Sequence, residues 1–433
     1  MVGASSDSIL SRRNHRWALG RYVIRDIGEC YPVRMGLNTE LQPGTVAFRR
    51  ANWALNLGGF ACFTLLYGTQ PILPQFTETF GISPTMASLA VSAGALTLSI
   101  LLIPLSLLSD RFGRAPLMKA ALLGATLCAA LSALAPDFEW LILSRAGVGA
   151  CIAALPAAAM AYLGEEIAPE ARGRVMGMYI AGNALGGMFG RFLSALVTQF
   201  SSWHFGLAAL ALVGLVCTLA FWKMLPPAQH FKSRSMAPGA LWRDIVQIYQ
   251  DPGLPWLFTT AFLIMGAFVS IYNYLGFRLS AAPYDLEPAA IGAIFLLYAV
   301  GSASSALAGH LADRYGRSLI MRGMIAAMAI GVLATLDSHL AIIIGGLAVF
   351  TVGYFATHAI ASAWVGARAG ERRGLVSALY LSSYYLGSSF LGSTSGPLWT
   401  YFAWPGMVAG LMLCVTLVLA VALYLTRLEH SGR

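Results

Sequence analysis

The chain has 433 residues, of which 58% are hydrophobic and only 11% are charged. Soluble globular domains carry about 25% charged residues, so this composition excludes a soluble protein and predicts one embedded in a membrane. The net charge of +9 invites a nucleic-acid partner, but the positions of the basic residues, described below, exclude one.

The first 48 residues form a polar, basic extension without the apolar core of a signal peptide. We expect this extension to lie in the cytoplasm and the first apolar span to act as its own insertion signal. Met35 is a candidate translation start, which would leave residues 1–34 untranslated. N-terminal sequencing that finds residues before Met35 would exclude this hypothesis.

Apolar stretches of about 20 residues, long enough to cross a bilayer as helices, occupy nearly all of the remaining chain. Gly, Ala and Ser are frequent inside them, which favours close helix packing in lipid. We therefore predict an all-α polytopic membrane protein with twelve transmembrane helices. The predicted spans are 51–73, 86–108, 117–135, 140–163, 175–198, 205–222, 256–277, 289–311, 319–336, 340–364, 375–400 and 404–426.

The spans divide into two six-helix bundles, at 49–222 and 255–427, followed by a tail at 428–433. The longest polar segment, 223–254, joins them, and its amphipathic run "ALWRDIVQIY" predicts a short helix along the membrane surface. Two motifs repeat between the halves: "SLLSDRFGRA" at 106–115 with "GHLADRYGRS" at 309–318, and 169–187 with 370–388. Two independent repeats at nearly equal offsets indicate internal duplication, which is typical of one class of secondary transporter.

The loops alternate in charge. Of the 28 Lys and Arg residues, 25 lie before the first span, in alternate loops or in the tail, and the intervening loops hold none. Since cytoplasmic loops are enriched in Lys and Arg, both termini are predicted to be cytoplasmic. The basic loops are 109–119, 165–174, 223–254, 312–322 and 366–374.

The repeated loop motif resembles the hallmark of the major facilitator superfamily, G-x-L-A-D-R-x-G-R-[RK]. The second copy matches at Gly309, Leu311, Ala312, Asp313, Arg314, Gly316 and Arg317. The first copy keeps Asp110, Arg111, Gly113 and Arg114 but has Ser106 and Ala115 at its ends. "YGTQPILPQFTETFGISP", "YLGEEI" and "SSYYLGSS" resemble the acriflavine-sensitivity (YnfM-type) branch of bacterial inner-membrane transport proteins.

This resemblance implies the major facilitator fold and a secondary active transporter in the bacterial inner membrane. We expect a monomer that moves a small organic compound by alternating access, as a proton-coupled efflux antiporter. Import of a sugar or small organic anion is the alternative, and a membrane sensor without flux is a remote one. No P-loop, catalytic cluster or metal-ligand spacing occurs in the sequence, and the six Cys are scattered, so we expect neither an enzyme nor a cofactor or metal.

The loop motifs suggest a latch between neighbouring helices, which stabilises the outward-facing arrangement and must break for the other. Asp110 is expected to cap the N-terminus of span eleven, where an anion is favoured, while Arg114 pairs within its own loop. Gly113 and Gly316 allow the tight turn. The second copy contributes Asp313, Arg314 and Arg317, and the other repeat contributes Arg172 and Arg373. For Arg111 and Arg314, a plain topology signal is an equally good interpretation.

Three Arg residues remain inside spans: Arg145, Arg191 and Arg278. Arg278 lies at a span end and is expected to reach the interface. Arg145 has the R-x-x-x-G spacing to Gly149 that, by resemblance, is linked to proton transfer. A buried Arg costs at least about 2.5 kcal/mol, so a functional role is the default. The alternative is a structural pair with a carbonyl or a nearby Glu.

Arg191 follows a glycine-rich stretch in span five that resembles the G-P-x-x-G-G motif of exporting, proton-antiporting members. Asn183 replaces the Pro, which removes one source of a helix kink. The glycines are expected to let spans five and eight pack closely. The residues concerned are Gly182, Asn183, Gly186 and Gly187.

Spans one, four, seven and ten are expected to line the central cavity. Their polar residues, with one from span eleven, are Tyr67, Gln70, Arg145, Tyr272, Asn273, Tyr354, His358 and Tyr384. His358 either handles a proton or substrate or forms a structural hydrogen bond between helices. No Asp or Glu lies in the interior of a span, so the cavity suits an anionic or neutral compound better than a cation.

Overall fold

The computed structural model describes residues 18–19, 22–24, 30–32, 40–231 and 238–431. Three short strands precede the helices: β1 (Ala18–Leu19), β2 (Tyr22–Ile24) and β3 (Cys30–Pro32). They pair antiparallel in the order β1-β2-β3, with Ala18 opposite Val23 and Val23 opposite Tyr31. Met35 lies outside the described residues, so the proposed translation start stays a hypothesis.

The N-terminal bundle contains six membrane-length helical units. Two labels do not count as separate units, because α5 and α6 form one broken unit and α2 is a short helix of 8 residues that follows α1. The elements are α1 (Val46–Tyr67), η1 (Gln70–Ile72), α2 (Leu73–Phe80), α3 (Pro84–Phe112), α4 (Arg114–Ala133), α5 (Phe138–Ile152), α6 (Leu155–Glu166), η2 (Pro169–Ala171), α7 (Arg172–Phe200) and α8 (Trp203–Met224).

The amphipathic linker segment forms α9 (Pro238–Tyr249), as predicted. The C-terminal bundle follows with six units, of which one is divided into α11, η3 and α12. Its elements are α10 (Leu254–Leu279), α11 (Pro288–Ile294), η3 (Phe295–Leu297), α12 (Tyr298–Tyr315), α13 (Arg317–Ala334), α14 (Leu340–Arg368), η4 (Gly370–Arg372), α15 (Arg373–Thr394) and α16 (Gly396–Ser431).

The twelve predicted spans are confirmed as twelve helical units in the described part of the chain. Ten of these units are long and apolar enough by composition alone to cross a membrane. The other two, α1 and α15, have 22 residues each but are less apolar, because α1 includes Arg49 and Arg50 and α15 is rich in Ser and Tyr. Each of these helices also buries polar side chains that have hydrogen-bond partners, such as Thr64 on α1 and Ser388 on α15.

Several predicted span boundaries were wrong where proline or strain interrupts a helix. Span four is broken at Ala153 and Ala154, because Pro156 opens a new helix at its second position. Span eleven ends at Thr394 rather than at residue 400, and the chain turns within α16 at Ala403, which has φ 51°.

Glycine allows several close contacts between helices, and one of them recurs in both bundles. On α7, Gly182, Gly186 and Gly190 face α1, and a Cβ added at Gly186 would lie 2.0 Å from the Phe60 carbonyl oxygen. The same contact recurs in the second bundle, where α15 meets α10. There, a Cβ added at Gly387 would lie 2.0 Å from the carbonyl oxygen of Phe262 in α10.

The predicted packing partner of the span-five glycines was therefore wrong. They contact span one (α1), whereas span eight (α11 and α12) lies on another face of α7, where Gly292 approaches Ala195. Gly187 faces the side chains of Arg191 and Phe63. The glycines were correctly predicted to mark close packing, but the pattern does not specify which helix approaches.

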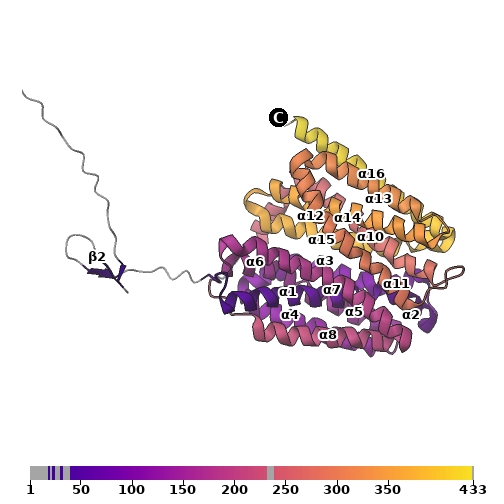
Figure 1. Cartoon of the computed structure of the whole chain (residues 1–433), viewed down its shortest axis with the longest axis horizontal. Helices are drawn as coiled ribbons and strands as arrows, with labels where there is room; N and C mark the ends of the chain where they lie inside the picture. Colours follow the sequence, from indigo (N-terminus) through magenta and orange to yellow (C-terminus); the bar gives the residue numbers. More distant parts are fainter. Residues whose placement is uncertain (1–17, 20–21, 25–29, 33–39, 232–237, 432–433) are drawn as a thin grey trace, which may run out of the picture.

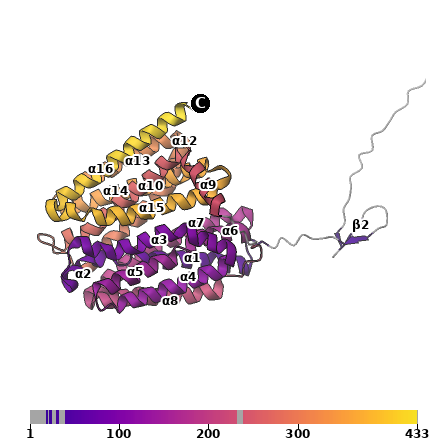
Figure 2. The ribbon, with the colours of Figure 1, turned by 180° about the vertical axis from the view of Figure 1, so that it is seen from behind.

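The two bundles lie side by side with their helices running in the same general direction (Figure 1). We call the end that carries Glu78, Asp137 and Asp337 the acidic end, where α2 and α11 lie. The opposite end is the basic end, where α7 begins at Arg172 and η4 ends at Arg372. Helix α9 also lies at the basic end (Figure 2).

Hydrogen bonds between the bundles are restricted to the region from the middle of the molecule to the acidic end. Ser99 and Ser382, which exchange two bonds of 2.7 and 3.0 Å, form the contact nearest the basic end. Among the described residues, no inter-bundle hydrogen bond or ion pair occurs beyond them toward the basic end. The other pairs are Tyr67–Ser388, Gln70–Asn273, Gln70–Val269, Ser92–Ser393 and Gln199–Ala289.

Candidate substrate site and gating contacts

A chain of polar side chains crosses the interface between the bundles in their acidic half. Arg191 of α7 donates from Nε to Gln70 Oε1 at 2.7 Å, and Gln70 Nε2 donates to Asn273 Oδ1 at 2.8 Å. Asn273 of α10 then donates to the Gly392 carbonyl at 3.2 Å. The prolines at 71 and 74 stop α1 and place Gln70 in a 3-10 turn at this point, so the amide faces both bundles.

Arg191 is 3% exposed and is surrounded by aromatic rings from both bundles. Its guanidinium carbon lies 4.7 Å from the ring centre of Tyr67, 5.0 Å from Tyr298 and 5.2 Å from Phe295. Such cation–π contacts contribute about 0.5–2 kcal/mol each. No carboxylate forms an ion pair with Arg191 among the described residues, so its charge is balanced only by rings and neutral oxygens.

Arg145 has a different environment, although the sequence placed it in the same cavity. Its three guanidinium nitrogens donate to the carbonyl oxygens of Ala90 (3.2 Å), Leu65 (2.7 Å) and Leu66. The side chain is 1% exposed, and all of its partners belong to α1 and α3 of its own bundle. These contacts match the structural alternative, in which Arg145 joins three helices and each of its guanidinium nitrogens is bonded to a carbonyl oxygen.

The remaining predicted cavity residues gather in a cluster of aromatic side chains in the C-terminal bundle. Tyr354 bonds to the Tyr384 hydroxyl at 2.5 Å and stacks on Phe268 with ring centres 3.8 Å apart. His358 of α14 meets the Tyr380 hydroxyl of α15 through Nδ1 at 3.0 Å, and its ring lies 4.7 Å from that of Tyr384. His358 thus forms a helix–helix hydrogen bond and is half-buried.

The structure therefore divides the predicted cavity residues into groups. Gln70 and Asn273 meet directly, Tyr354, His358 and Tyr384 form a second group, and Arg145 stands apart. Tyr67 bonds to Ser388 at 3.2 Å across the interface, and Tyr272 bonds to Thr351 at 2.7 Å within its bundle.

Two aromatic residues beside Arg191, Phe295 and Tyr298, were missed by the sequence reasoning. They belong to span eight, which was not expected to line the cavity. Span eight is broken at 295–297 by the turn η3, and this break directs both rings toward α7. The only signal in the sequence was the adjacency of aromatic residues in "IFLLYAV", which is common in apolar spans.

The first loop motif forms a compact ion cluster. Arg114 is 5% exposed, pairs with Asp110 four residues earlier, and donates to Glu165 of α6 at 2.9 Å. Gly113 has φ +100°, as expected for the tight turn. The pairing of Arg114 within its loop is confirmed. In this structure Asp110 does not cap span eleven, and the cap stays a prediction for the outward-facing arrangement. Asp110 is bound instead by Arg114, which lies four residues later.

The second copy of the motif is more open. Gly316 has φ +90°, and Arg317 bonds to Glu429 of α16 at 3.4 Å and lies 5.4 Å from the Trp364 ring. Asp313 is exposed and forms no ion pair among the described residues. Arg111 and Arg314 are exposed and lie over the neighbouring rings of Phe112 and Tyr315, which fits the topology interpretation.

The segment that precedes each bundle is attached to the loop before that bundle's fifth span. In the N-terminal bundle, Glu40 pairs with Arg172 at 3.3 Å. In the C-terminal bundle, Asp244 pairs with Arg372 at 3.0 Å, while Arg373 is exposed and forms no ion pair with the described residues. The repeat thus preserves the attachment, although the arginine that makes it shifts by one position from the predicted Arg373.

Two further contacts fix the linker. Asp251 accepts hydrogen bonds of 3.0 Å from Arg368 and of 2.8 Å from the Gly253 and Leu254 amides. Partial burial raises the pKa of Asp251, but these donors outweigh it and hold the pKa below its ordinary value. At the other end of the linker, Glu166 accepts from the His230 backbone at 2.7 Å.

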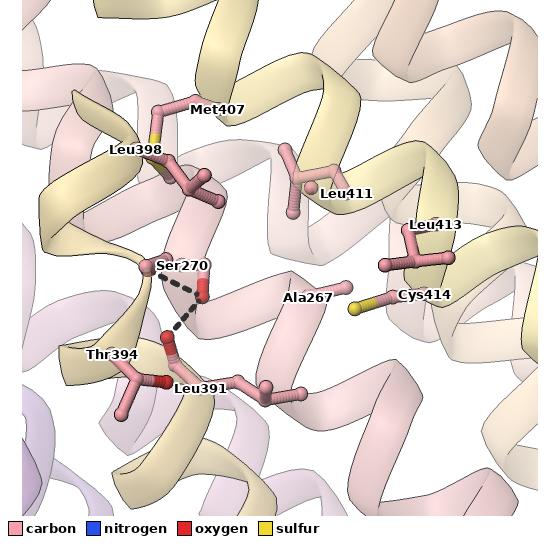
Figure 3. Close-up of a pocket in the computed structure, with 11 residues that line it drawn as sticks. Ala267, Ser270, Leu391, Thr394, Leu398, Met407, Leu411, Leu413 and Cys414 are labelled. Carbon is pink, nitrogen blue, oxygen red and sulfur yellow. Dashed lines mark hydrogen bonds between the residues drawn. The ribbon is translucent and has the colours of Figure 1, made fainter. Parts of the chain in front are cut away.

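One cavity of about 200 Å³ lies away from this interface, between α10, α15 and α16 (Figure 3). Ser270 donates to the Leu391 carbonyl at 2.9 Å and accepts from Ser395, so both hydroxyls are occupied. The rest of the wall is mainly apolar, with the Cys414 sulfur facing the cavity (Figure 3). None of the predicted site residues lines it.

Comparison with known proteins gives consistent matches over about nine tenths of the chain. A family model described as Major Facilitator Superfamily matches residues 55–305 and 279–433. The inner membrane transport protein YnfM of Escherichia coli is 40% identical over 394 residues, which cover 91% of this chain and 94% of that protein. The MFS-type transporter YybF of Bacillus subtilis is 38% identical over 388 residues, with 90% and 95% covered.

Solved structures of low sequence identity share the fold. A bacterial homologue of the human lysosomal transporter Spinster, in an inward-facing and unoccupied conformation, superposes with a TM-score of 0.72 at 15% identity. The superposition covers 88% of this chain and 97% of that one. At this identity the likeness shows the fold alone.

Proposed function

Since the chain belongs to the major facilitator superfamily, we propose that it exports a small organic compound in exchange for protons, by alternating access between its two bundles. That it is a multi-pass membrane transporter follows from its family. The direction of transport, the coupling to protons and the monomeric state are the proposed parts.

The observation that carries this proposal is the asymmetry of the interface. Inter-bundle hydrogen bonds extend from Ser99 and Ser382 to the acidic end and are absent toward the basic end in the described part of the chain. Bundles joined at one end only can rock to close the other end. With the basic end in the cytoplasm, as the distribution of Lys and Arg favours, this is an inward-facing state.

The proposed proton carrier is His358. It is the only His in the interior of a predicted span, and no Asp or Glu lies there, so it is the side chain whose ordinary pKa lies nearest neutrality. Its Nδ1 is bonded to Tyr380, while Nε2 forms no hydrogen bond among the described residues. The side chain is half-buried, and we propose access to it from the basic end, where no hydrogen bond joins the bundles among the described residues.

Export is proposed over import because the span-five stretch ending at Arg191 resembles the motif of exporting members. The positions Gly182, Gly186 and Gly187 keep the glycines of that motif. Uptake of a sugar or small organic anion is the competing function, and the same experiment separates the two.

The test uses everted inner-membrane vesicles that contain the full chain and are acidified inside by respiration. Benzoate, D-glucose and chloramphenicol serve as anionic, neutral and drug-like probes, with an acridine dye reporting the interior pH. Efflux in exchange for protons predicts that at least one probe dissipates the gradient, and that His358→Gln abolishes the response. Accumulation of a probe by right-side-out vesicles under an inward proton gradient would instead identify an importer.

A further inference from the structure

We infer that Arg191 binds a carboxylate group of the transported compound, and that the Gln70 side chain occupies this position when no compound is bound. The inference rests on the proposed function, because it names the chemical class of compound that the interface site accepts. We also infer that displacement of Gln70 from Arg191 couples binding of the compound to opening of the acidic end.

The first argument is the unbalanced charge of Arg191. A cation buried in a membrane protein is costly, and natural proteins place a counter-charge or several carbonyls beside it. Arg145 reaches three carbonyl oxygens. Arg191 reaches only one carbonyl, that of Gly187 at 2.6 Å, and one amide oxygen. An anion that arrives with the transported compound supplies the missing charge.

The second argument is the edge of the guanidinium that remains available. Nε is bonded to Gln70, Nη1 is bonded to Gly187, and Nη2 forms no hydrogen bond with the described residues. Nε and Nη2 together form the fork that binds a carboxylate through two parallel bonds. The Gln70 oxygen is a neutral acceptor at this fork, and charge-assisted bonds are roughly twice as strong as neutral ones.

The third argument is the wall around the fork. The rings of Tyr67, Phe295 and Tyr298 surround the guanidinium. The Tyr298 hydroxyl is buried without a hydrogen-bond partner, although buried hydroxyls are normally paired. An acceptor bound beside Arg191 gives this hydroxyl a partner. The aromatic wall favours a carboxylate attached to an apolar body.

Displacement of Gln70 has a consequence for the gate. Gln70 Nε2 bonds to Asn273 Oδ1 at 2.8 Å and to the Val269 carbonyl at 3.4 Å, both in the other bundle. When a carboxylate takes the place of the Gln70 oxygen on Arg191, the amide loses the bond that orients it. The two bonds to α10 are then weakened, and the acidic end is released when the compound binds.

The binding test uses the purified full-length protein in detergent with acetate, hexanoate, benzoate and phenylacetate. Each acid is compared with its uncharged primary amide by isothermal titration calorimetry. We expect at least one carboxylate to bind and its amide to bind at least tenfold more weakly. Arg191→Gln should reduce the affinity at least tenfold, Arg191→Lys should retain part of it, and Tyr298→Phe should reduce it less than Arg191→Gln.

The matched control is Arg174→Gln, which removes an exposed arginine from the same helix and should leave the affinity unchanged. Absence of binding by all four carboxylates, equal binding of acid and amide, or full affinity in folded Arg191→Gln would overturn the inference. Folding of each variant is checked by size-exclusion chromatography. If Arg191→Gln does not fold, the acid–amide comparison and the Arg191→Lys variant decide the question.

The gating part is tested with spin labels at Glu78 and Ser338, which are exposed on different bundles at the acidic end. A bound carboxylate should lengthen this distance, and Gln70→Ala should lengthen it without ligand. An unchanged distance in both cases overturns the gating link. A second pair at Glu170 and Glu371, at the basic end, reports alternating access itself. If the distance between these two labels changes but no carboxylate binds in the calorimetric test, this inference is refuted and the proposed transport function stands.

Discussion

The contact between α7 and α1 makes a sharp prediction about glycine. In Gly186→Ala, the new methyl group would lie 2.0 Å from the Phe60 carbonyl oxygen, so the helices must separate by about 1 Å to restore an ordinary contact. Overpacking of this kind costs about 1–3 kcal/mol, and a backbone oxygen cannot rotate away as a side chain does. The gain in helix propensity, about 0.5–1 kcal/mol, offsets part of this. Together these ranges leave a net loss of about 1 kcal/mol, and at most about 2.5 kcal/mol.

The control lies on the same helix. A Cβ added at Gly177 meets no atom within 4 Å, so Gly177→Ala should stabilise the protein by about 0.5–1 kcal/mol through helix propensity alone. Gly387→Ala on α15 and Gly374→Ala repeat the comparison in the second bundle. Unfolding is followed by tryptophan fluorescence during titration with sodium dodecyl sulfate in mixed micelles. Equal stability of Gly186→Ala and Gly177→Ala would refute the close-contact reasoning.

Three further predictions concern buried or paired polar groups. Arg145→Gln should lower the free energy of unfolding by about 2–4 kcal/mol in the same titration, because it leaves buried carbonyls unpaired, whereas a loss below 1 kcal/mol would contradict the structural role. Tyr298→Phe should leave the ligand-free protein equally or more stable, since it removes a buried hydroxyl without a partner. The pKa of Asp251 is lowered in the folded protein, so its contacts with Arg368 should stabilise the linker fully at a pH above the unfolded pKa of about 3.9. This stabilisation should be lost as the pH falls through the lower pKa of the folded state. Hydrogen exchange of α9 between pH 7 and pH 3 should show this loss, and Arg368→Gln should reduce protection already at pH 7.

Much of the architecture followed from patterns that act within one helix or one turn. The twelve spans, the duplication, α9 and the turns at Gly113 and Gly316 all depend on local composition or on a backbone angle that favours glycine. Helix breaks were harder to locate. Pro156 was visible in the sequence, but a proline within an apolar stretch predicts either a kink or an end, and the packing around α5 and α6 decides between them.

The partners of individual side chains were less predictable, because they depend on how helices are oriented around their axes. Asp110 had two possible partners, a helix terminus in the other bundle and Arg114 one turn away, and in this arrangement of the bundles Arg114 binds it. Arg145 and Arg191 are similar in the sequence, as single arginines in glycine-containing spans. Only the three-dimensional arrangement reveals that one reaches three carbonyls and the other lies among rings at the interface.

The paired attachments at the basic end also bear on how the molecule is put together. Glu40 is tied to Arg172 and Asp244 to Arg372, so every bundle holds the segment that enters it by its own ion pair. Neither ion pair includes a residue of the other bundle. If residues 1–231 and 238–433 are translated as two separate polypeptides, each one contains its own ion pair. We therefore expect the two polypeptides to assemble into one carrier when they are made in the same membrane.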